Sequence, residues 1–322
     1  MPLPVYFAPL EGVTDAIFRR LHRERFPGVA KYYIPFISPT QNLLFTSREL
    51  SAIAPEANAG VPAVPQVLCK DAEQFLWAAR ELAQMGYGEV NLNLGCPSGT
   101  VTAKGKGAGM LADVCHLERF LDEVFARAPL PVSVKTRIGV TSPAEFERLL
   151  ELFSRYPICE LTIHPRTRTQ FYKGQPHREV FARALEQTAL PLVYNGDLFL
   201  PEDCLARERD YPGTRALMLG RGLIANPALA RTLAGGPPLE HEELRAFHDA
   251  LFSAYSARYP GHVAVGRMRE ISRHFACCLE DAHKPLKAIR KAASLPAYAE
   301  AAARLFDTCA LRENPGFTPD AP

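Results

Sequence analysis

Eight short apolar segments recur along this chain of 322 residues, and they constrain its fold more than any other feature. Most are near-continuous hydrophobic runs, a pattern typical of parallel strands that are covered on both faces. The predicted strands are Val5–Leu10, Ala30–Pro35, Ala63–Leu68, Val90–Leu94, Pro131–Thr136, Glu160–His164, Pro191–Tyr194 and Arg215–Leu219. Helical patterns separate the strands, and three of them, with their predicted start residues, are Ala72–Met85 after Asp71, Leu117–Ala128 after Asp113 and Pro143–Tyr156 after Ser142.

Eight strand-plus-helix units predict an α/β fold of the (β/α)8, or TIM barrel, type. A doubly wound parallel sheet is the alternative. Polar residues or glycines follow nearly every predicted strand, and this favours the closed barrel, whose active sites lie at the carboxyl ends of the strands.

The pattern changes at Gly235-Gly236-Pro237-Pro238, where the strand-like runs stop. We therefore predict a catalytic barrel over 1–236, an all-helical domain over 237–313 and a tail over 314–322. The predicted helices of the second domain are Leu239–Tyr259, Val263–Leu279, Lys284–Ala293 and Pro296–Cys309. The proline-rich segment Arg312–Pro322 is expected to be poorly ordered.

The charges of the chain almost balance, with a net charge of +2, so any binding of nucleic acid must come from a local patch. Gly261–Lys291 is the candidate, because it contains seven Lys and Arg residues against three Asp and Glu residues, a net charge of +4. This segment points weakly to RNA, and an ordinary solvated helix surface is the alternative.

The eight cysteines include no C-x-x-C pair and no zinc-type spacing, so we expect reduced thiols and neither a disulfide framework nor a metal site. The first residues lack the basic region and cleavage site of a signal peptide, and no later segment has the length and apolarity of a membrane span. The expected location is the cytoplasm.

The carboxyl ends of the predicted strands carry most of the polar residues that chemistry needs. These are Glu11-Gly12, Gln66, Asn93, Cys96, Lys135, Arg137, His164, Arg166, Asn195-Gly196-Asp197 and Gly220-Arg221-Gly222. The last two groups follow the seventh and eighth strands, where such barrels commonly bind a phosphate. Glycine lets backbone N–H groups approach an anion and Arg221 can add a forked donor, whereas two tight turns are the alternative.

Lys135 lies within an apolar strand, where an unpaired ammonium is unfavourable. It either pairs with an electron-rich group of a cofactor or forms a Schiff base. His164 and Gln66 are each open to a structural interpretation, as a core histidine and a strand cap, but together with Lys135 they suggest a flavin site. The loop after Cys96 contains Lys104 and Lys106 and matches neither a P-loop nor a dinucleotide-binding fingerprint, so it is either a flexible lid or a contact for a polyanion.

Taken together, these residues resemble the dihydrouridine synthase family of flavoenzymes. The resemblance covers the barrel from Ala8 to about Asn226 and continues into the C-terminal helices, and it is specific because several motifs occur in order on the expected strands. The matching segments are Ala8-Pro9-Leu10-Glu11-Gly12-Val13-Thr14-Asp15, Asn93-x-Gly95-Cys96-Pro97 with Lys104-Gly105 and Gly107-Ala108-Gly109, Val132–Arg137, His164-x-Arg166-Thr167, Asn195-Gly196-Asp197 and Leu219-Gly220-Arg221-Gly222.

The resemblance implies an FMN-containing barrel and a helical domain that together bind a folded RNA, usually tRNA. It implies that NADPH reduces the flavin, that hydride passes from flavin N5 to C6 of a uracil, and that Cys96 donates a proton to C5. The product is dihydrouridine. A thiol suits this role because it is mostly protonated at neutral pH. The uridine must be flipped out of the folded RNA to reach the flavin.

The same resemblance assigns the remaining site residues and a monomeric state. Implied FMN-binding residues are Pro9, Leu10, Glu11, Gly12, Gln66, Lys135, His164, Arg166, Asn195, Gly196, Asp197, Gly220 and Arg221. Implied RNA-binding residues are Asn93, Lys104, Lys106, Arg269, Arg273 and Lys287. Pro165 and Glu11 depart from the family pattern. The rival functions are a small-molecule reductase of the dihydroorotate dehydrogenase type, a lyase that uses Lys135 as a Schiff base, and a non-catalytic RNA-binding protein.

Overall fold

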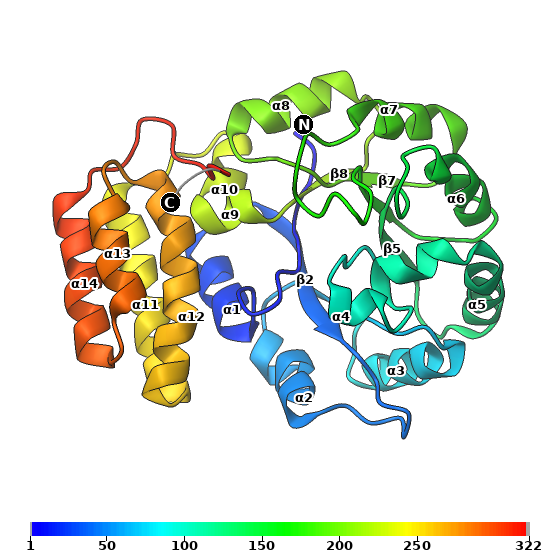
Figure 1. Ribbon diagram of the computed structural model, residues 1–322, viewed down its shortest axis with the longest axis horizontal. Helices are drawn as coiled ribbons and strands as arrows, with labels where there is room; N and C mark the ends of the chain where they lie inside the picture. The colour runs from blue at the N-terminus through cyan, green and yellow to red at the C-terminus, as the bar shows by residue number, and fades with distance from the viewer. Residues whose placement is uncertain (1, 320–322) are drawn as a thin grey trace.

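The structure is a computed structural model that describes residues 2–319. Eight parallel strands pair in sequence order and close into a barrel, as Figure 1 shows. The strands are β1 Val5–Phe7, β2 Val29–Ile37, β3 Ala63–Val67, β4 Val90–Leu94, β5 Val132–Arg137, β6 Leu161–His164, β7 Leu192–Tyr194 and β8 Ala216–Leu219. The predicted (β/α)8 fold with helices at its C-terminal end is therefore confirmed.

Helices surround the barrel in the intervals between the strands. They are α1 Ala16–Arg25, α2 Ser47–Ile53, α3 Ala72–Gln84, α4 Gly99–Thr102, α5 Val114–Arg127, α6 Glu145–Phe153, α7 Arg178–Gln187, α8 Pro201–Asp210, α9 Arg221–Ala225 and α10 Leu229–Leu233, with 3-10 turns at η1 Glu56–Asn58 and η2 Gly107–Ala112. No helix within residues 2–319 combines the length and apolarity that crossing a membrane requires.

Two of the three predicted helix starts are confirmed by their capping bonds. The carboxylates of Asp71 and Asp113 each accept a hydrogen bond from a backbone N–H in the first turn, which satisfies a donor that the helix itself cannot pair. The predicted start after Ser142 is wrong, because α6 begins at Glu145. The Glu145 carboxylate accepts N–H groups from 140–142 and holds that segment in a turn.

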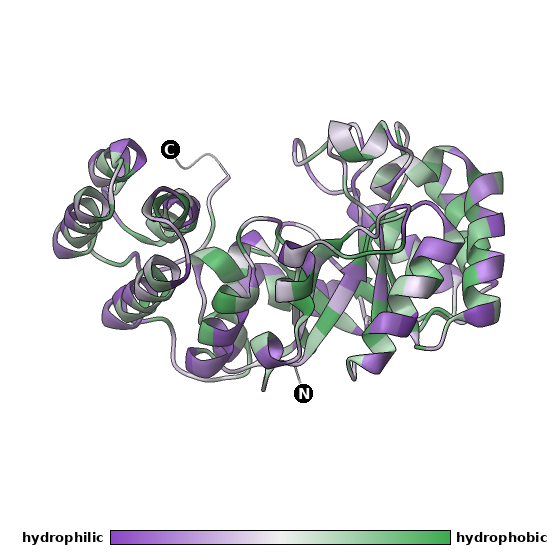
Figure 2. Ribbon diagram, turned by 90° about the horizontal axis from the view of Figure 1, so that it is seen from below, coloured by the Kyte–Doolittle hydropathy of each residue, from purple (hydrophilic) through white to green (hydrophobic). Residues whose placement is uncertain are grey.

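The two faces of each strand have different surroundings. Along β4, Val90, Leu92 and Leu94 belong to the main hydrophobic core, and Figure 2 shows apolar residues concentrated on the strands and on the inner sides of the helices. Asn91 and Asn93 alternate with them and face the barrel interior, where they bond to polar groups of neighbouring strands. The asparagines that interrupt the apolar run are therefore the interior positions of the strand.

The amino ends of the strands form the barrel floor, which is closed by a partly buried ion-pair cluster. The Lys31 ammonium lies 2.6 Å from a carboxylate oxygen of Glu89 and 2.8 Å from one of Glu160. The Tyr6 hydroxyl donates to the other oxygen of Glu160 at 2.7 Å. Burial lowers the pKa of Lys31, but the hydrogen bonds to the two glutamates outweigh burial and leave this pKa raised. Every charge in the cluster has a partner.

Four helices follow the barrel and form a group at one side of it in Figure 1, with α11 packed against α1. They are α11 His241–Arg258, α12 Gly261–Phe275, α13 His283–Lys291 and α14 Leu295–Thr308, with a 3-10 turn at η3 Ala276–Cys278. Phe247 of α11 packs edge-on against Phe18 and Phe26, with ring centroids 5.5 and 5.2 Å apart. The division into domains at 236 and 313 stays a prediction.

The segment after α14 is packed against the rest of the molecule, so the expectation of a poorly ordered tail is wrong for its described part. The Arg312 side chain donates to the Leu279 carbonyl at 3.0 Å. The Pro315 carbonyl accepts from the Asn226 amide at 3.0 Å, and the Phe317 ring lies 5.0 Å from that of Phe199. Residues 320–322 of the predicted tail lie outside the described residues.

Candidate active site

Cys96 lies directly after β4, at the carboxyl ends of the strands, and Asn93 fixes the backbone around it. The Asn93 side-chain oxygen accepts the backbone N–H groups of Gly95 and Cys96 at 3.0 and 2.9 Å. The thiol is partly exposed and forms no disulfide. The structure therefore places Asn93 and Cys96 side by side at the carboxyl end of β4, with Cys96 partly exposed.

The glycine-rich loop packs directly beneath Cys96. The Ala108 N–H donates to the Cys96 carbonyl at 3.0 Å, and Gly107 has a φ of +58°. A Cβ atom on Gly107 would lie 2.9 Å from that carbonyl oxygen, so glycine is required for this close approach. Lys106 donates to Ser38 at 2.8 Å, whereas Lys104 is exposed. The loop is docked against the site and leaves Lys104 available to a ligand.

A chain of side-chain amides crosses the barrel interior behind Cys96. Asn93 donates to Gln66 at 2.6 Å, and Gln66 donates to Asn91 at 2.7 Å. Asn91 donates in turn to the Ser133 hydroxyl at 2.8 Å. Each amide nitrogen carries two N–H donors, so Asn93 and Gln66 each keep one donor for a ligand.

Lys135 lies on β5 opposite Asn93 in the register of the sheet. Among residues 2–319 its ammonium has no hydrogen-bond or ion-pair partner. Burial lowers the pKa of Lys135 to about 7, and the nearby Arg137 contributes to this shift. The site therefore contains a cation that is poorly stabilised until an electron-rich group pairs with it.

His164 ends β6 and is kept neutral by its surroundings. Burial, followed by the charges of Arg137 and Lys135, holds the pKa of His164 well below its usual range. An Arg166 guanidinium nitrogen lies 3.2 Å from the His164 Nε2 atom. Because a guanidinium can only donate, Nε2 must accept, and the ring proton resides on Nδ1. His164 therefore offers a ligand an N–H donor without a charge.

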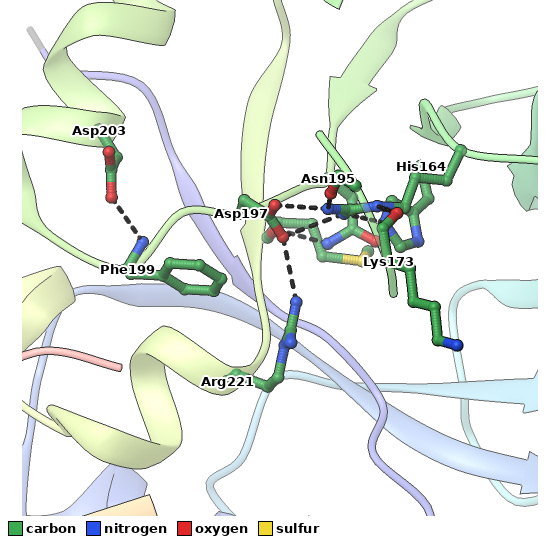
Figure 3. A network of polar contacts seen from close by, with 10 residues as sticks. His164, Lys173, Asn195, Asp197, Phe199, Asp203 and Arg221 are labelled. Atoms are coloured by element: carbon green, nitrogen blue, oxygen red, sulfur yellow. Dashed lines mark hydrogen bonds and ion pairs between the residues drawn. The ribbon is translucent and has the colours of Figure 1, made fainter. Parts of the chain in front are cut away.

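Arg166 is buried and fully engaged by the protein. Its partners His164, Lys173 and Asp197 are labelled in Figure 3. It pairs with both carboxylate oxygens of Asp197 at 3.0 and 2.6 Å and donates to the Lys173 and Gly174 carbonyls at 3.4 and 2.6 Å. With the bond to His164, each of its five N–H donors has an acceptor. This arrangement leaves no donor for the flavin or phosphate contact that the resemblance implies.

Arg221 begins α9 and differs from Arg166 in its polar contacts. One Arg221 nitrogen donates to Asp197 at 3.0 Å, and its other N–H donors have no partner among the described residues. Its guanidinium lies 4.8, 5.1 and 4.8 Å from the ring centroids of Tyr172, Phe199 and Phe317, so three aromatic rings surround it. Arg221 is thus held in place by these contacts and keeps N–H donors that a ligand could use.

The two predicted phosphate turns are tied to each other. The Asn195 side chain donates to the Met218 carbonyl at 2.8 Å, across β7 and β8. A Cβ atom on Gly222 would overlap the Leu198 carbonyl oxygen, so the turns pack at the distance that only glycine permits. Gly220 directly precedes Arg221, and Asp197, which follows Gly196, accepts a hydrogen bond from Arg221 at 3.0 Å, so the two turns meet at this arginine.

The loop after β1 lies beside the Gly220 turn. A Cβ atom on Gly220 would lie 3.2 Å from the Leu10 side chain, and the Leu10 N–H donates to Thr14 at 2.9 Å. Gly12, with a φ of +82°, turns the chain after Pro9 and Leu10. Glu11 is exposed and forms an ion pair with Arg48, so the family departure at this position is neutralised locally.

The predicted RNA-binding cations of the helical region separate into two groups. Arg269 donates to the Ala292 carbonyl at the end of α13, and Arg273 lies 3.7 Å from Glu270. Lys287 is exposed and, within residues 2–319, has no ion-pair partner. Lys284, Lys287 and Lys291 recur at helical spacing on α13, and all three are exposed.

Several residues of the site do not appear in the sequence-based prediction. These are Asn91, Tyr172, Phe199 and Phe317. The alternation along β4 could have identified Asn91, because it shares a face with Asn93. Arg137, by contrast, is among the residues predicted at the strand ends, and its guanidinium donates to the Gly95 and Thr167 carbonyls. No local sequence pattern singles out the three aromatic residues, since they come from separate loops.

Comparison with known proteins agrees with the geometry. A family model described as dihydrouridine synthase matches residues 6–311. A tRNA-dihydrouridine(16) synthase from Pseudomonas putida is 29% identical and covers 83% of this chain and 86% of its own length. A probable tRNA-dihydrouridine synthase from Rhodobacter capsulatus is 28% identical and covers 91% of each chain.

A solved structure of morphinone reductase supports the fold alone. It aligns with a TM-score of 0.52 at 13% identity and covers 74% of this chain and 87% of its own. The family model, in contrast, spans the barrel and nearly all of the C-terminal helices. This chain belongs to the dihydrouridine synthase family of oxidoreductases.

Proposed function

We propose that this protein reduces the C5–C6 double bond of a uridine in tRNA, with FMN as cofactor and NADPH as reductant. The observation that carries the proposal is the convergence of an accessible thiol, Cys96, with an unpartnered cation, Lys135, at the barrel mouth. The names of the relatives from Pseudomonas putida and Rhodobacter capsulatus support tRNA as the substrate. A monomeric state, which the resemblance implies, and the cytoplasmic location expected from the sequence complete the proposal.

The donors of the site fit a flavin mononucleotide. An isoalloxazine ring needs donors along its electron-rich edge, and Lys135, His164 and Gln66 supply a cation and two neutral N–H groups there. A phosphate needs charged and backbone donors, which Arg221 and the glycine turns offer. When bound, the flavin supplies the hydride. In this arrangement Arg166 donates a hydrogen bond to His164 and so fixes its ring, and it does not itself contact the cofactor.

Cys96 is the proposed proton donor and Asn93 its positioning partner. The thiol gives its proton to C5 of the uracil while Asn93 holds the base through its remaining amide proton. Because Asn93 also holds the Cys96 N–H, one side chain aligns the acid with the base.

The exposed cations of α13 and the docked loop are the proposed RNA contacts. A uridine must leave the folded RNA to reach the mouth, and unstacking it costs a few kcal/mol. Phosphate contacts by Lys284, Lys287 and Lys291 on α13 and by Lys104 on the loop offset this penalty. Arg269 is not part of this set, because the Ala292 carbonyl engages it.

The test is a reaction with the purified protein, tRNA that lacks dihydrouridine, FMN and NADPH. We expect a yellow protein whose flavin is bleached by NADPH and reoxidised by the tRNA, with dihydrouridine detected by mass spectrometry. Reoxidation by a small molecule and not by tRNA would favour the dihydroorotate dehydrogenase type of reductase.

The lowered pKa of Lys135 also suits a Schiff-base nucleophile, because the neutral amine is the reactive form. A lyase of that kind would be colourless, and borohydride would trap its carbonyl substrate on Lys135. The same purified protein therefore discriminates between the two chemistries.

A further inference from the structure

The described C-terminal residues cross back from α14 to the barrel and lie against α9, as the red segment of Figure 1 shows. We call residues 315–317 the C-terminal strap. The Pro315 carbonyl accepts from Asn226, the residue that ends α9. Gly316 is buried, and a Cβ atom there would lie 2.7 Å from the Phe199 carbonyl oxygen, so only glycine lets the strap lie this close.

The strap ends on the guanidinium of Arg221. The Phe317 ring centroid is 4.8 Å from the Arg221 Cζ atom and 5.0 Å from the Phe199 ring. On its other side Phe317 lies 5.6 Å from the ring of His274 in α12. Phe317 is therefore fixed between the helical region and the barrel, with its ring against the cation.

Arg221 needs such support because its polar contacts alone do not define its orientation. Its one hydrogen bond within residues 2–319, to Asp197, leaves the guanidinium plane free to turn about that contact. Tyr172 is 57% exposed and cannot fix the plane alone. The rings of Phe199 and Phe317 also pack against the guanidinium, and of these two Phe317 is the closer.

We propose that the C-terminal strap is part of the phosphate end of the cofactor site, and that Phe317 is a positioning residue that orients the unpartnered N–H donors of Arg221 toward a phosphomonoester. This inference rests on the proposed function, because it takes the phosphate of FMN as the ligand of Arg221. It adds a C-terminal segment, which lies outside the barrel in sequence, to the binding site.

The test compares FMN with riboflavin, which has the same ring but lacks the phosphate. The full-length protein is freed of flavin and titrated with each compound, with quenching of flavin fluorescence as the readout. We expect Phe317→Ala to weaken FMN binding about tenfold, which is the size of a partly buried cation–π contact, and to change riboflavin binding less than twofold.

Three further variants separate positioning from folding. Phe317→Tyr keeps the aromatic face and should restore FMN affinity, whereas Phe317→Leu keeps most of the volume and should not. Combining Phe317→Ala with Arg221→Ala should weaken FMN binding no more than Arg221→Ala alone, because the strap acts through Arg221. Phe125→Ala, which removes a partly buried ring packed on Tyr156 in the outer helices, is the control and should leave both affinities unchanged.

The outcomes distinguish this inference from the proposed function. Wild-type FMN affinity equal to that of riboflavin would remove the phosphate site, and with it the cofactor proposal. Wild-type preference for FMN that Phe317→Ala and Phe317→Leu both retain would overturn the role of the strap alone. Equal losses of FMN and riboflavin affinity in these variants would show a structural effect and would also overturn it.

Discussion

The two ends of the barrel each contain a partly buried lysine, but the two lysines have opposite surroundings. At the floor, Lys31 lies between the carboxylates of Glu89 and Glu160, and its pKa is raised. At the mouth, Lys135 has no partner among residues 2–319, and burial lowers its pKa to about 7. The floor satisfies its charges within the protein, whereas the mouth leaves them to be satisfied by a ligand.

This difference shows that the presence of a hollow does not by itself mark a functional site. A cavity of about 500 Å³ opens at the floor, lined by residues that include Lys31, Asn58 and Glu89. Its charged groups already pair with one another, so it offers little to a ligand. In barrels of this kind, residues at the floor serve stability and those at the mouth serve chemistry.

The largest expected effect comes from the mouth. Cys96→Ala should lower the rate of dihydrouridine formation by a factor of about 10² to 10⁴, because it removes the proposed proton donor. The free energy of unfolding should change by less than about 1 kcal/mol, since the thiol is partly exposed. Rates from mass spectrometry and urea unfolding measure the two quantities, and a wild-type rate in the variant would exclude Cys96 as the acid.

Substitution at the floor should affect stability strongly and cofactor binding little, the reverse of the effect at the mouth. Lys31→Met leaves the partly buried Glu89 without its cation and Glu160 with only the more distant Arg215, which should reduce the free energy of unfolding by about 2 kcal/mol in urea titrations. FMN affinity of the folded variant should stay unchanged. Arg20→Met, which removes an exposed ion pair with Glu24, is the control and should alter stability by less than about 0.5 kcal/mol. A loss of cofactor affinity in Lys31→Met would contradict the separation of the two ends.

Replacing the lysine at the mouth should stabilise the cofactor-free protein. Lys135→Met removes an unpaired charge and should increase the free energy of unfolding by about 1 to 2 kcal/mol below pH 7. The folded-state pKa of Lys135, about 7, lies below the unfolded value of 10.5, so wild-type stability gains from this group as the pH rises between them. The advantage of the variant should shrink over that interval.

The uptake of protons on cofactor binding gives a second test of the role of Lys135. If Lys135 pairs with the flavin, binding should raise its pKa, and the wild type should take up a proton near pH 8 that Lys135→Met does not. Calorimetry in buffers of different ionisation enthalpy measures this uptake. Equal proton uptake by the two proteins would show that the lysine does not face the flavin.

The smallest effects are expected for tRNA binding by the helical surface. There, the exposed lysines of α13 should differ from Arg269, which already has a partner in the protein. Lys287→Ala and Lys291→Ala together should weaken tRNA binding severalfold and reduce the slope of log K against log salt by up to about 1.8, if each contacts one phosphate. Arg269→Ala should leave the slope unchanged, because this residue binds the Ala292 carbonyl. Filter binding across a range of salt concentrations distinguishes the two, and an equal slope change in both would place Arg269 at the RNA.

Most of the fold could be predicted because its signals are local and repeated. Each strand is an apolar run, and Asp71 and Asp113 are caps that act within their own helices. The error at Ser142 arose because Glu145, three residues further on, attracts the N–H groups of the preceding turn. The tail was misjudged because Phe317 packs against residues that are distant in sequence.

The site was less predictable, because the availability of a side chain depends on its tertiary partners. Arg166 and Arg221 both follow strands in motifs of similar appearance. Their difference arises from Asp197, which takes two bonds from Arg166 and one from Arg221, and from the 173–174 carbonyls that complete Arg166. No spacing in the sequence reports how many donors a guanidinium has left.

The amide chain in the barrel interior has a fixed direction, and this direction sets what the site can select. Two backbone N–H groups point at the oxygen of Asn93, and since they can only donate, they fix that amide and then, in sequence, Gln66 and Asn91. The free position on Asn93 is therefore a donor. If Asn93 holds the base as proposed, a keto oxygen of the pyrimidine is complementary to this donor, whereas an amino group would meet a second donor. The backbone of Gly95 and Cys96 would then favour keto over amino bases.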